Sequence, residues 1–165
     1  MKVEDISVQL GEIWDDALRM EGAPVNIRLF KTNKAYKDII MNIIEFMLDA
    51  MDASYDNYTD LSGISGANIG IPLNIIVAHL GEDETVMINP EIIEKSEETR
   101  IAKSNCGSLN LPAPIKVERH KWVRVKYYDE SGKSHTKKVE EGAGTVQHEI
   151  DHNKGIMIID KEIKD

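Results

Sequence analysis

The sequence lacks the features that mark secreted or membrane-spanning proteins. It has one cysteine, Cys106, so it can form no intramolecular disulfide, which favours a reducing compartment. No stretch approaches the roughly 18 consecutive apolar residues that a spanning helix needs. The N-terminus has no apolar core of a signal peptide and is too acidic for a transit peptide. We therefore expect a cytoplasmic protein with no membrane partner.

Basic residues are also in the minority. Lysine and arginine number 20 against 29 aspartates and glutamates, which gives a formal net charge of −9. Nucleic-acid binding needs a concentrated basic surface, so we expect no nucleic-acid partner. The remaining composition, 41% hydrophobic and 30% charged without repeats or low-complexity linkers, fits a single domain over residues 1–165. No pattern in the sequence indicates an oligomeric state.

Apolar spacing predicts a helix near each end with strands between them. From residue 33 to about 54, apolar residues recur three and four apart, and Thr32 or Asn33 can cap the start. A second helix is expected at about 142–154. Short β-type runs occupy 74–78, 85–88, 92–95, 122–128 and 134–140, the last two joined as a hairpin. The pattern predicts an α+β fold.

Other segments carry weaker patterns. We expect residues 55–72 to form a loop, because they are rich in Gly, Ser and Asn, and the first 30 residues to wrap the surface. The N-terminal amphipathic helix should bury its apolar residues in the core: Ile39, Ile40, Ile43, Ile44, Met47, Leu48 and Met51.

The segment QHEIDH, residues 147–152, falls in the second expected helix. His148 and His152 are four residues apart and therefore share one helix face. With Glu149 nearby as a base, they form the HExxH arrangement of metallohydrolases, which predicts a bound metal. Asp151 is either a neighbour that orients a ligand or a solvated side chain.

The third metal ligand is not fixed by this motif. A catalytic zinc-type site uses three protein ligands and keeps one position open. An extended motif would place a histidine where this chain has Ile158, and only 13 residues follow His152. We therefore expect the ligand upstream, from Cys106, His79, His120, His135 or an acidic residue, with Asp160 and Glu162 as candidates near the chain end.

Three stretches occur in the order and form of a known family. GISGANIG (63–70), NCGSL (105–109) and QHEIDHNKG (147–155) resemble the signature motifs of peptide deformylases. Residues 87–98 and 123–133 resemble the strands beside the second motif, so the resemblance covers about residues 35–160. It implies antiparallel sheets packed around the motif helix. It also implies hydrolysis of the N-formyl group from formyl-methionine of new polypeptides, with release of formate.

The resemblance implies the metal centre as well. Cys106, His148 and His152 would hold one divalent metal ion, and Glu149 would act as general base and acid. Fe(II) is the family's preferred metal, with Zn, Ni or Co able to replace it, and one thiolate with two imidazoles suits these ions.

Substrate contacts are expected from the same motifs. The oxyanion donors would be the side-chain amide of Asn68 and the backbone N–H of Gly107. Ser108 and Gln147 are expected to support the site as polar neighbours. Ile64 and Thr145 are candidate walls of a methionine pocket. Ile64 fits the core equally well, and Thr145 could bond back to the helix backbone.

The chain departs from the family pattern at several positions. Asn68 is one methylene shorter than the family's glutamine, and a customary arginine position reads Gly144. Gly66 and Gly107 replace larger residues and would enlarge the space near the metal. The remaining departures are Ser65, Ser104 and Asn105.

These departures leave three functions open. The main interpretation is a deformylase with a weakened oxyanion hole. The second is an amide hydrolase of the same fold that acts on a bulkier N-acyl group. The third is a metal-bearing protein that binds peptides without turnover, although Glu149 argues against it because binding alone needs no base.

Overall fold

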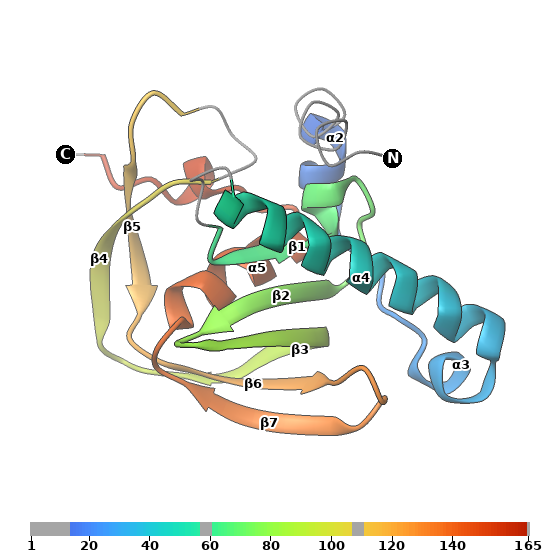
Figure 1. Ribbon diagram of the computed structural model, residues 1–165. Helices are drawn as coiled ribbons and strands as arrows, with labels where there is room; N and C mark the ends of the chain where they lie inside the picture. The colour runs from blue at the N-terminus through green and yellow to red at the C-terminus, as the bar shows by residue number, and fades with distance from the viewer. Residues whose placement is uncertain (1–13, 57–60, 107–110, 165) are drawn as a thin grey trace.

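The computed structural model describes residues 14–56, 61–106 and 111–164, and it shows an α+β fold (Figure 1). This confirms the predicted class. The helices are α2 (Trp14–Arg19), α3 (Ile27–Thr32), α4 (Lys34–Asp56) and α5 (Ala143–Asn153), with 3₁₀ turns η1 (Gly66–Ile69) and η2 (Ile158–Lys161). Within the described part, no helix is both long and apolar enough to cross a membrane.

The strands form two antiparallel sheets. The larger has the order β1-β2-β3-β6-β7, and the smaller pairs β4 with β5 (Figure 1). Their bounds are β1 (Gly63–Ser65), β2 (Ile75–Leu80), β3 (Asp83–Lys95), β4 (Thr99–Ser104), β5 (Ile115–His120), β6 (Val123–Tyr128) and β7 (Ser134–Val139).

The large sheet is buried on both faces. Successive side chains of a strand point to opposite faces, and β2 begins with a run of four apolar residues. Ile75 and Val77 pack in the core cluster under α4, whereas Ile76 and Ala78 pack in the cluster under α5. An unbroken apolar run is what a strand covered on both faces requires. Helices α4 and α5 therefore cover opposite faces of the sheet.

Helix α4 agrees with the expected amphipathic helix, with one exception. Asn33 caps its start, because its Oδ1 accepts a hydrogen bond of 3.0 Å from the backbone N–H of Tyr36. The buried face carries Ile40, Ile44, Met47 and Met51. Ile39 was expected in the core, but it is 57% exposed because it lies beside this face and not within it.

The expected strands 85–88 and 92–95 belong to one strand, β3. The strand passes Asn89 and Pro90 through a bulge, where Asn89 adopts a φ of 52°. The side-chain amide of Asn89 forms two hydrogen bonds of 2.8 Å with the backbone of Val25. The bulge therefore also holds the N-terminal segment against the sheet.

Other expectations need correction. The expected loop 55–72 contains β1 and η1, and the pattern missed β4 and β5. The described part of the first 30 residues does more than wrap the surface. Leu18, Val25 and Phe30 are almost fully buried, so this segment contributes to the core.

Candidate metal centre

Helix α5 places the two histidines of the motif together. It begins after Gly142, whose φ of 81° and close contact with the His79 carbonyl suit a residue without a side chain. His148 and His152 are one turn apart, and their Nε2 atoms lie 3.1 Å from each other. The predicted helix and the shared face are both present.

Cys106 completes a group of three donors. It follows β4, is 4% exposed, and its Sγ lies 3.5 Å from Nε2 of His152. In the described part of the chain, Cys106, His148 and His152 are the cluster able to hold a metal ion, with donor atoms within 4.8 Å of one another. A tetrahedral metal places two nitrogens about 3.4 Å apart and a sulfur and a nitrogen about 3.6 Å apart. The two spacings that involve Nε2 of His152, 3.1 Å to His148 and 3.5 Å to Cys106, are close to these values, so the three residues could hold a metal ion.

The other candidates for the third ligand are engaged elsewhere. Asp160 accepts hydrogen bonds from Arg19 and from the backbone of Met157, at 2.5 and 2.8 Å. The remaining histidines each lie beside another acceptor: His79 by Glu84, His120 by the Ser96 carbonyl, and His135 by Asp129. Glu162 is exposed, and its backbone pairs with Val117.

Burial keeps both imidazoles neutral. It lowers the pKa of His148 to about 3 and that of His152 to about 4, and the positive charge of Arg119 acts in the same direction on both. A histidine must be neutral to bind a metal. The pair is therefore in the protonation state of a ligand throughout the neutral range.

Glu149 lies on the same helix and is fully enclosed. Burial raises its pKa to about 8, against the opposing effect of Arg119, and a cation bound beside it would lower the pKa again. Its Oε2 has no hydrogen-bond partner among the described residues. Such an acceptor is costly to bury unless a ligand or water satisfies it.

A glycine of β1 makes room for this carboxylate. A Cβ on Gly63 would lie 2.6 Å from the Thr145 methyl carbon and 2.9 Å from Cγ of Glu149. Both distances are shorter than van der Waals contact, so only glycine lets β1 approach α5 this closely. The first motif therefore lies directly against the third.

The amide of Asn68 is held in one orientation. Its Oδ1 accepts hydrogen bonds from the backbone N–H and the hydroxyl of Ser65, at 2.7 and 2.6 Å. Because the oxygen accepts both hydrogen bonds from Ser65, the NH₂ group is the donor end of the amide and points away from Ser65. Ser65 stands where the family has a different residue, and its role as an anchor for Asn68 was not foreseen.

Gln147 joins α5 to the small sheet. Its Oε1 accepts from the backbone N–H of His120 at 3.0 Å, and its Nε2 donates to the carbonyl oxygens of His120 and Ala143 at 2.9 and 3.0 Å. None of these hydrogen bonds involves Cys106, His148 or His152. Since β4 leads into Cys106 and α5 carries the histidines, Gln147 supports the site by fixing one part against the other.

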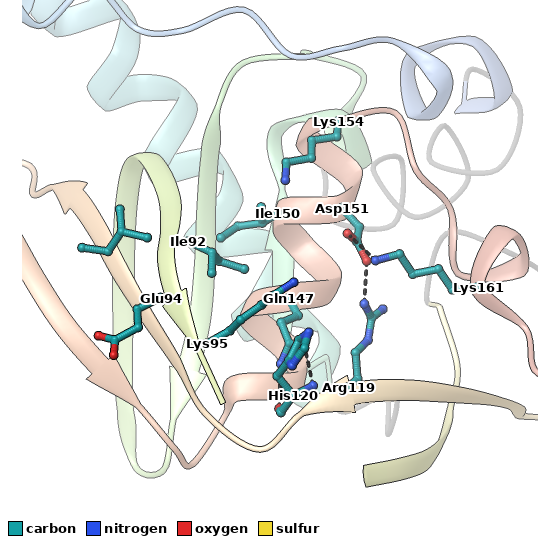
Figure 2. A pocket seen from close by; sticks show the side chains of 11 residues that line it. Ile92, Glu94, Lys95, Arg119, His120, Gln147, Ile150, Asp151, Lys154 and Lys161 are labelled. Atoms are coloured by element: carbon teal, nitrogen blue, oxygen red, sulfur yellow. Dashed lines mark hydrogen bonds and ion pairs between the residues drawn. The ribbon is translucent and has the colours of Figure 1, made fainter. Parts of the chain in front are cut away.

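Asp151 is buried in a charged cluster and not solvated. Figure 2 shows its carboxylate between Arg119 and Lys161, at 2.5 and 2.9 Å. The Arg119 side chain is only 5% exposed. A second link therefore connects β5 and η2 to the residue that precedes His152.

Comparisons with known proteins agree with this geometry. A family model for polypeptide deformylase matches residues 9–165. The chain belongs to the polypeptide deformylase family. A peptide deformylase of Pseudothermotoga lettingae is 37% identical over 145 residues, covering 87% of this chain and 80% of the relative. The deformylase of Syntrophomonas wolfei is 34% identical over 152 residues, which cover 91% of this chain and 90% of the relative.

Solved deformylases share the fold. The Thermotoga maritima enzyme superimposes with a TM-score of 0.75 at 30% identity, covering 91% of this chain and 93% of that one. The Synechococcus elongatus enzyme in complex with actinonin gives a TM-score of 0.75 at 27% identity. The superposition covers 93% of this chain and 78% of that one. The family, its α+β fold and its class of hydrolase are confirmed as the motifs predicted.

One expected pocket residue lies elsewhere. Ile64 pairs with Val77 and packs in the core cluster under α4, on the face of the sheet opposite α5. It therefore does not line a pocket beside the histidines, and that expectation is wrong. Thr145 does lie on the α5 side, where its hydroxyl is 3.1 Å from that of Ser62. Gly107 and Ser108 lie outside the described residues.

The two glycines that replace larger family residues differ in their surroundings. A Cβ on Gly66 would lie 2.5 Å from the Ile71 carbonyl oxygen and 2.8 Å from that of Leu73, so Gly66 closes the loop and does not enlarge the site. Beside Gly144 there is open space, and the nearest group is the guanidinium of Arg100, 3.8 Å from a built Cβ. The guanidinium of an arginine from β4 thus lies beside the helix position at which the family has an arginine.

Proposed function

We propose that this protein removes the formyl group from N-formylmethionyl peptides, with one divalent metal ion held by Cys106, His148 and His152. The observation that carries the proposal is the cluster of three donor atoms within 4.8 Å beside the buried carboxyl of Glu149. We propose Fe(II) as the native metal, with Zn, Ni or Co able to replace it. Because newly made polypeptides are the substrate, we also propose a cytoplasmic location.

Each residue has a distinct part in the proposed hydrolysis. The metal, when bound, lowers the pKa of a water and polarises the formyl oxygen. Glu149 would accept a proton from the attacking water and return it to the leaving amine. The NH₂ group of Asn68, set by Ser65, donates to the oxyanion, and we assign the second donor to the backbone N–H of Gly107.

The remaining residues bind or position. We assign Thr145 to the wall that receives the methionine side chain, because it lies on the α5 face turned toward Gly63. Gln147 fixes α5 against the strand pair that leads to Cys106. Ser108 remains an expected polar neighbour of the thiolate.

The direct test is hydrolysis of matched peptides. Protein loaded with Fe(II) or Co(II) without oxygen is incubated with formyl-Met and acetyl-Met peptides, and free amine and formate are measured. We expect release of formate from the formyl peptide and little amine from the acetyl peptide. Preferential hydrolysis of the acetyl peptide would indicate a different N-acyl substrate. Binding without turnover of either peptide would contradict the enzymatic proposal.

Asn68 offers a test of the oxyanion donor. We expect Asn68→Ala to lower kcat by about 10²–10³-fold, the usual effect of losing one such donor, with unchanged metal content. Asn68→Gln should give no gain in rate, because Asn68 is buried and its amide oxygen is fitted to Ser65, an arrangement that a longer side chain would disturb. The exposed Asn42 supplies the control variant Asn42→Ala. A faster Asn68→Gln enzyme together with an unchanged Asn68→Ala enzyme would show that no donor acts here.

A further inference from the structure

A groove lies beside α5, away from the metal centre. It has a volume of about 300 Å³, and β3, β5, α5 and η2 contribute its walls. Its α5 residues are Gln147, Ile150, Asp151 and Lys154, which are three, four and seven positions apart and so share one helix face. His148 and His152 lie on another face, since each residue advances the helix by about 100°. The groove and the metal centre therefore use different sides of the same helix.

Cations surround this groove although the chain is acidic overall. Four positively charged side chains line it: Lys95, Arg119, Lys154 and Lys161. Two carboxylates also line it, but Glu94 is paired with Arg124 at 2.6 Å, outside the groove. Only Asp151 remains to balance the four cations. The groove thus carries local positive charge in a chain with a net charge of −9.

The positively charged side chains of the groove have N–H donors that the hydrogen bonds described here do not use. Arg119 uses NH1 toward Asp151, and a guanidinium has five N–H donors. Among the described residues, Lys95 and Lys154 form no ion pair with any carboxylate. Figure 2 shows their amino ends directed toward the α5 face that carries Ile150. The guanidinium of Arg119 and the ammonium groups of Lys95 and Lys154 line one groove, and such groups bind the oxygens of a dianionic phosphate.

The floor of the groove is apolar. Ile92 and Ile150 line it, and Ile150 is only 2% exposed. A ligand with a phosphate and an apolar body would contact both kinds of surface. The volume lies at the lower end of the range for small-molecule sites, which is about 300–1,000 Å³.

We propose that this groove binds a phosphate-bearing small molecule, with Arg119, Lys95 and Lys154 holding the phosphate and Ile92 and Ile150 contacting the apolar part. The site is separate from the proposed deformylation chemistry and does not depend on it. Bound phosphate would lie beside the Arg119–Asp151 pair, so the ligand would also restrain the link between β5 and α5.

The test uses zinc-loaded protein, phenyl phosphate and inorganic phosphate as probes, and isotope-labelled isoleucine methyl groups as reporters. We expect saturable shifts of the Ile92 and Ile150 methyls, no shift of Ile64 in the core under α4, and tighter binding of phenyl phosphate than of inorganic phosphate. The double variant Lys95→Glu/Lys154→Glu should weaken binding by about tenfold or more, because charge-assisted hydrogen bonds are lost.

A matched control separates the groove from general electrostatics. Lys126 and Lys137 are exposed on β6 and β7, outside the groove, so Lys126→Glu/Lys137→Glu changes the net charge equally. We expect the Kd of this control for phenyl phosphate to lie within about twofold of the Kd of the protein without substitutions, since screened surface charges have small effects. Equal weakening in both double variants, or no saturable shift of Ile92 and Ile150, would overturn the proposal. A response only to short RNA or to anionic vesicles would also overturn it.

Discussion

Replacing Glu149 by alanine is expected to lower the rate of deformylation by about 10²–10⁴-fold, the range contributed by a general base. The metal content should stay unchanged, because the three ligands are Cys106, His148 and His152. The side chain is enclosed and one of its oxygens has no hydrogen-bond partner among the described residues, so this oxygen is not occupied by another contact that would compete for a proton. The measurement is kcat/KM on a formyl-Met peptide, together with metal analysis of the same samples.

Two further variants make this result specific. Glu149→Gln keeps the size and removes the base, so its rate should fall as far as that of Glu149→Ala. Glu97 is exposed, and Glu97→Ala should leave both rate and metal content unchanged. Turnover that persists in both Glu149 variants would remove this residue from the mechanism. If the protein without any substitution were also inactive, the proposed function itself would be wrong.

Loss of the thiolate is expected to have the second large effect. Cys106→Ala should reduce bound metal well below one ion per chain, because two imidazoles alone leave the site short of the usual three protein ligands. The fold should survive, since Cys106 packs in a small cluster with Val117 and Ile158 and not in the main core. Metal analysis after anaerobic purification and circular dichroism would measure the two quantities.

The structure also limits what could compensate for that loss. Asp160, the acidic alternative near the chain end, is already bonded to Arg19 and to the backbone of Met157. Full metal occupancy in Cys106→Ala would therefore refute the assignment and would require Asp160 to leave these partners. Cys106→Ser, which keeps a small polar side chain but not the soft thiolate, should bind less metal than the unchanged protein.

The sequence predicted local features better than contacts between distant segments. The spacing of His148 and His152 defined both their helix and their shared face, because a helix places residues four apart together. The β2 run was recognised as a strand because residues 74–78 form a short run of β-type residues. In contrast, β4 has mostly exposed positions and no apolar alternation, so nothing in its sequence distinguished it from a loop.

Contacts made across the fold could not be predicted in this way. Ile64 was assigned to a pocket because it lies in a motif, but which face of a three-residue strand meets α5 depends on the register with β2. The link between Gln147 and the His120 backbone joins residues 27 positions apart. Gly66 was expected to open space, yet the returning chain at Ile71 fills it.

The guanidinium of Arg100 lies beside Gly144, 3.8 Å from a Cβ built on that residue, so a strand brings a positive charge to the open space beside α5. Two arginines at these positions would bring like charges together and repel each other, so each disfavours the other. The choice of side chain at residue 144 therefore depends on the residue at position 100.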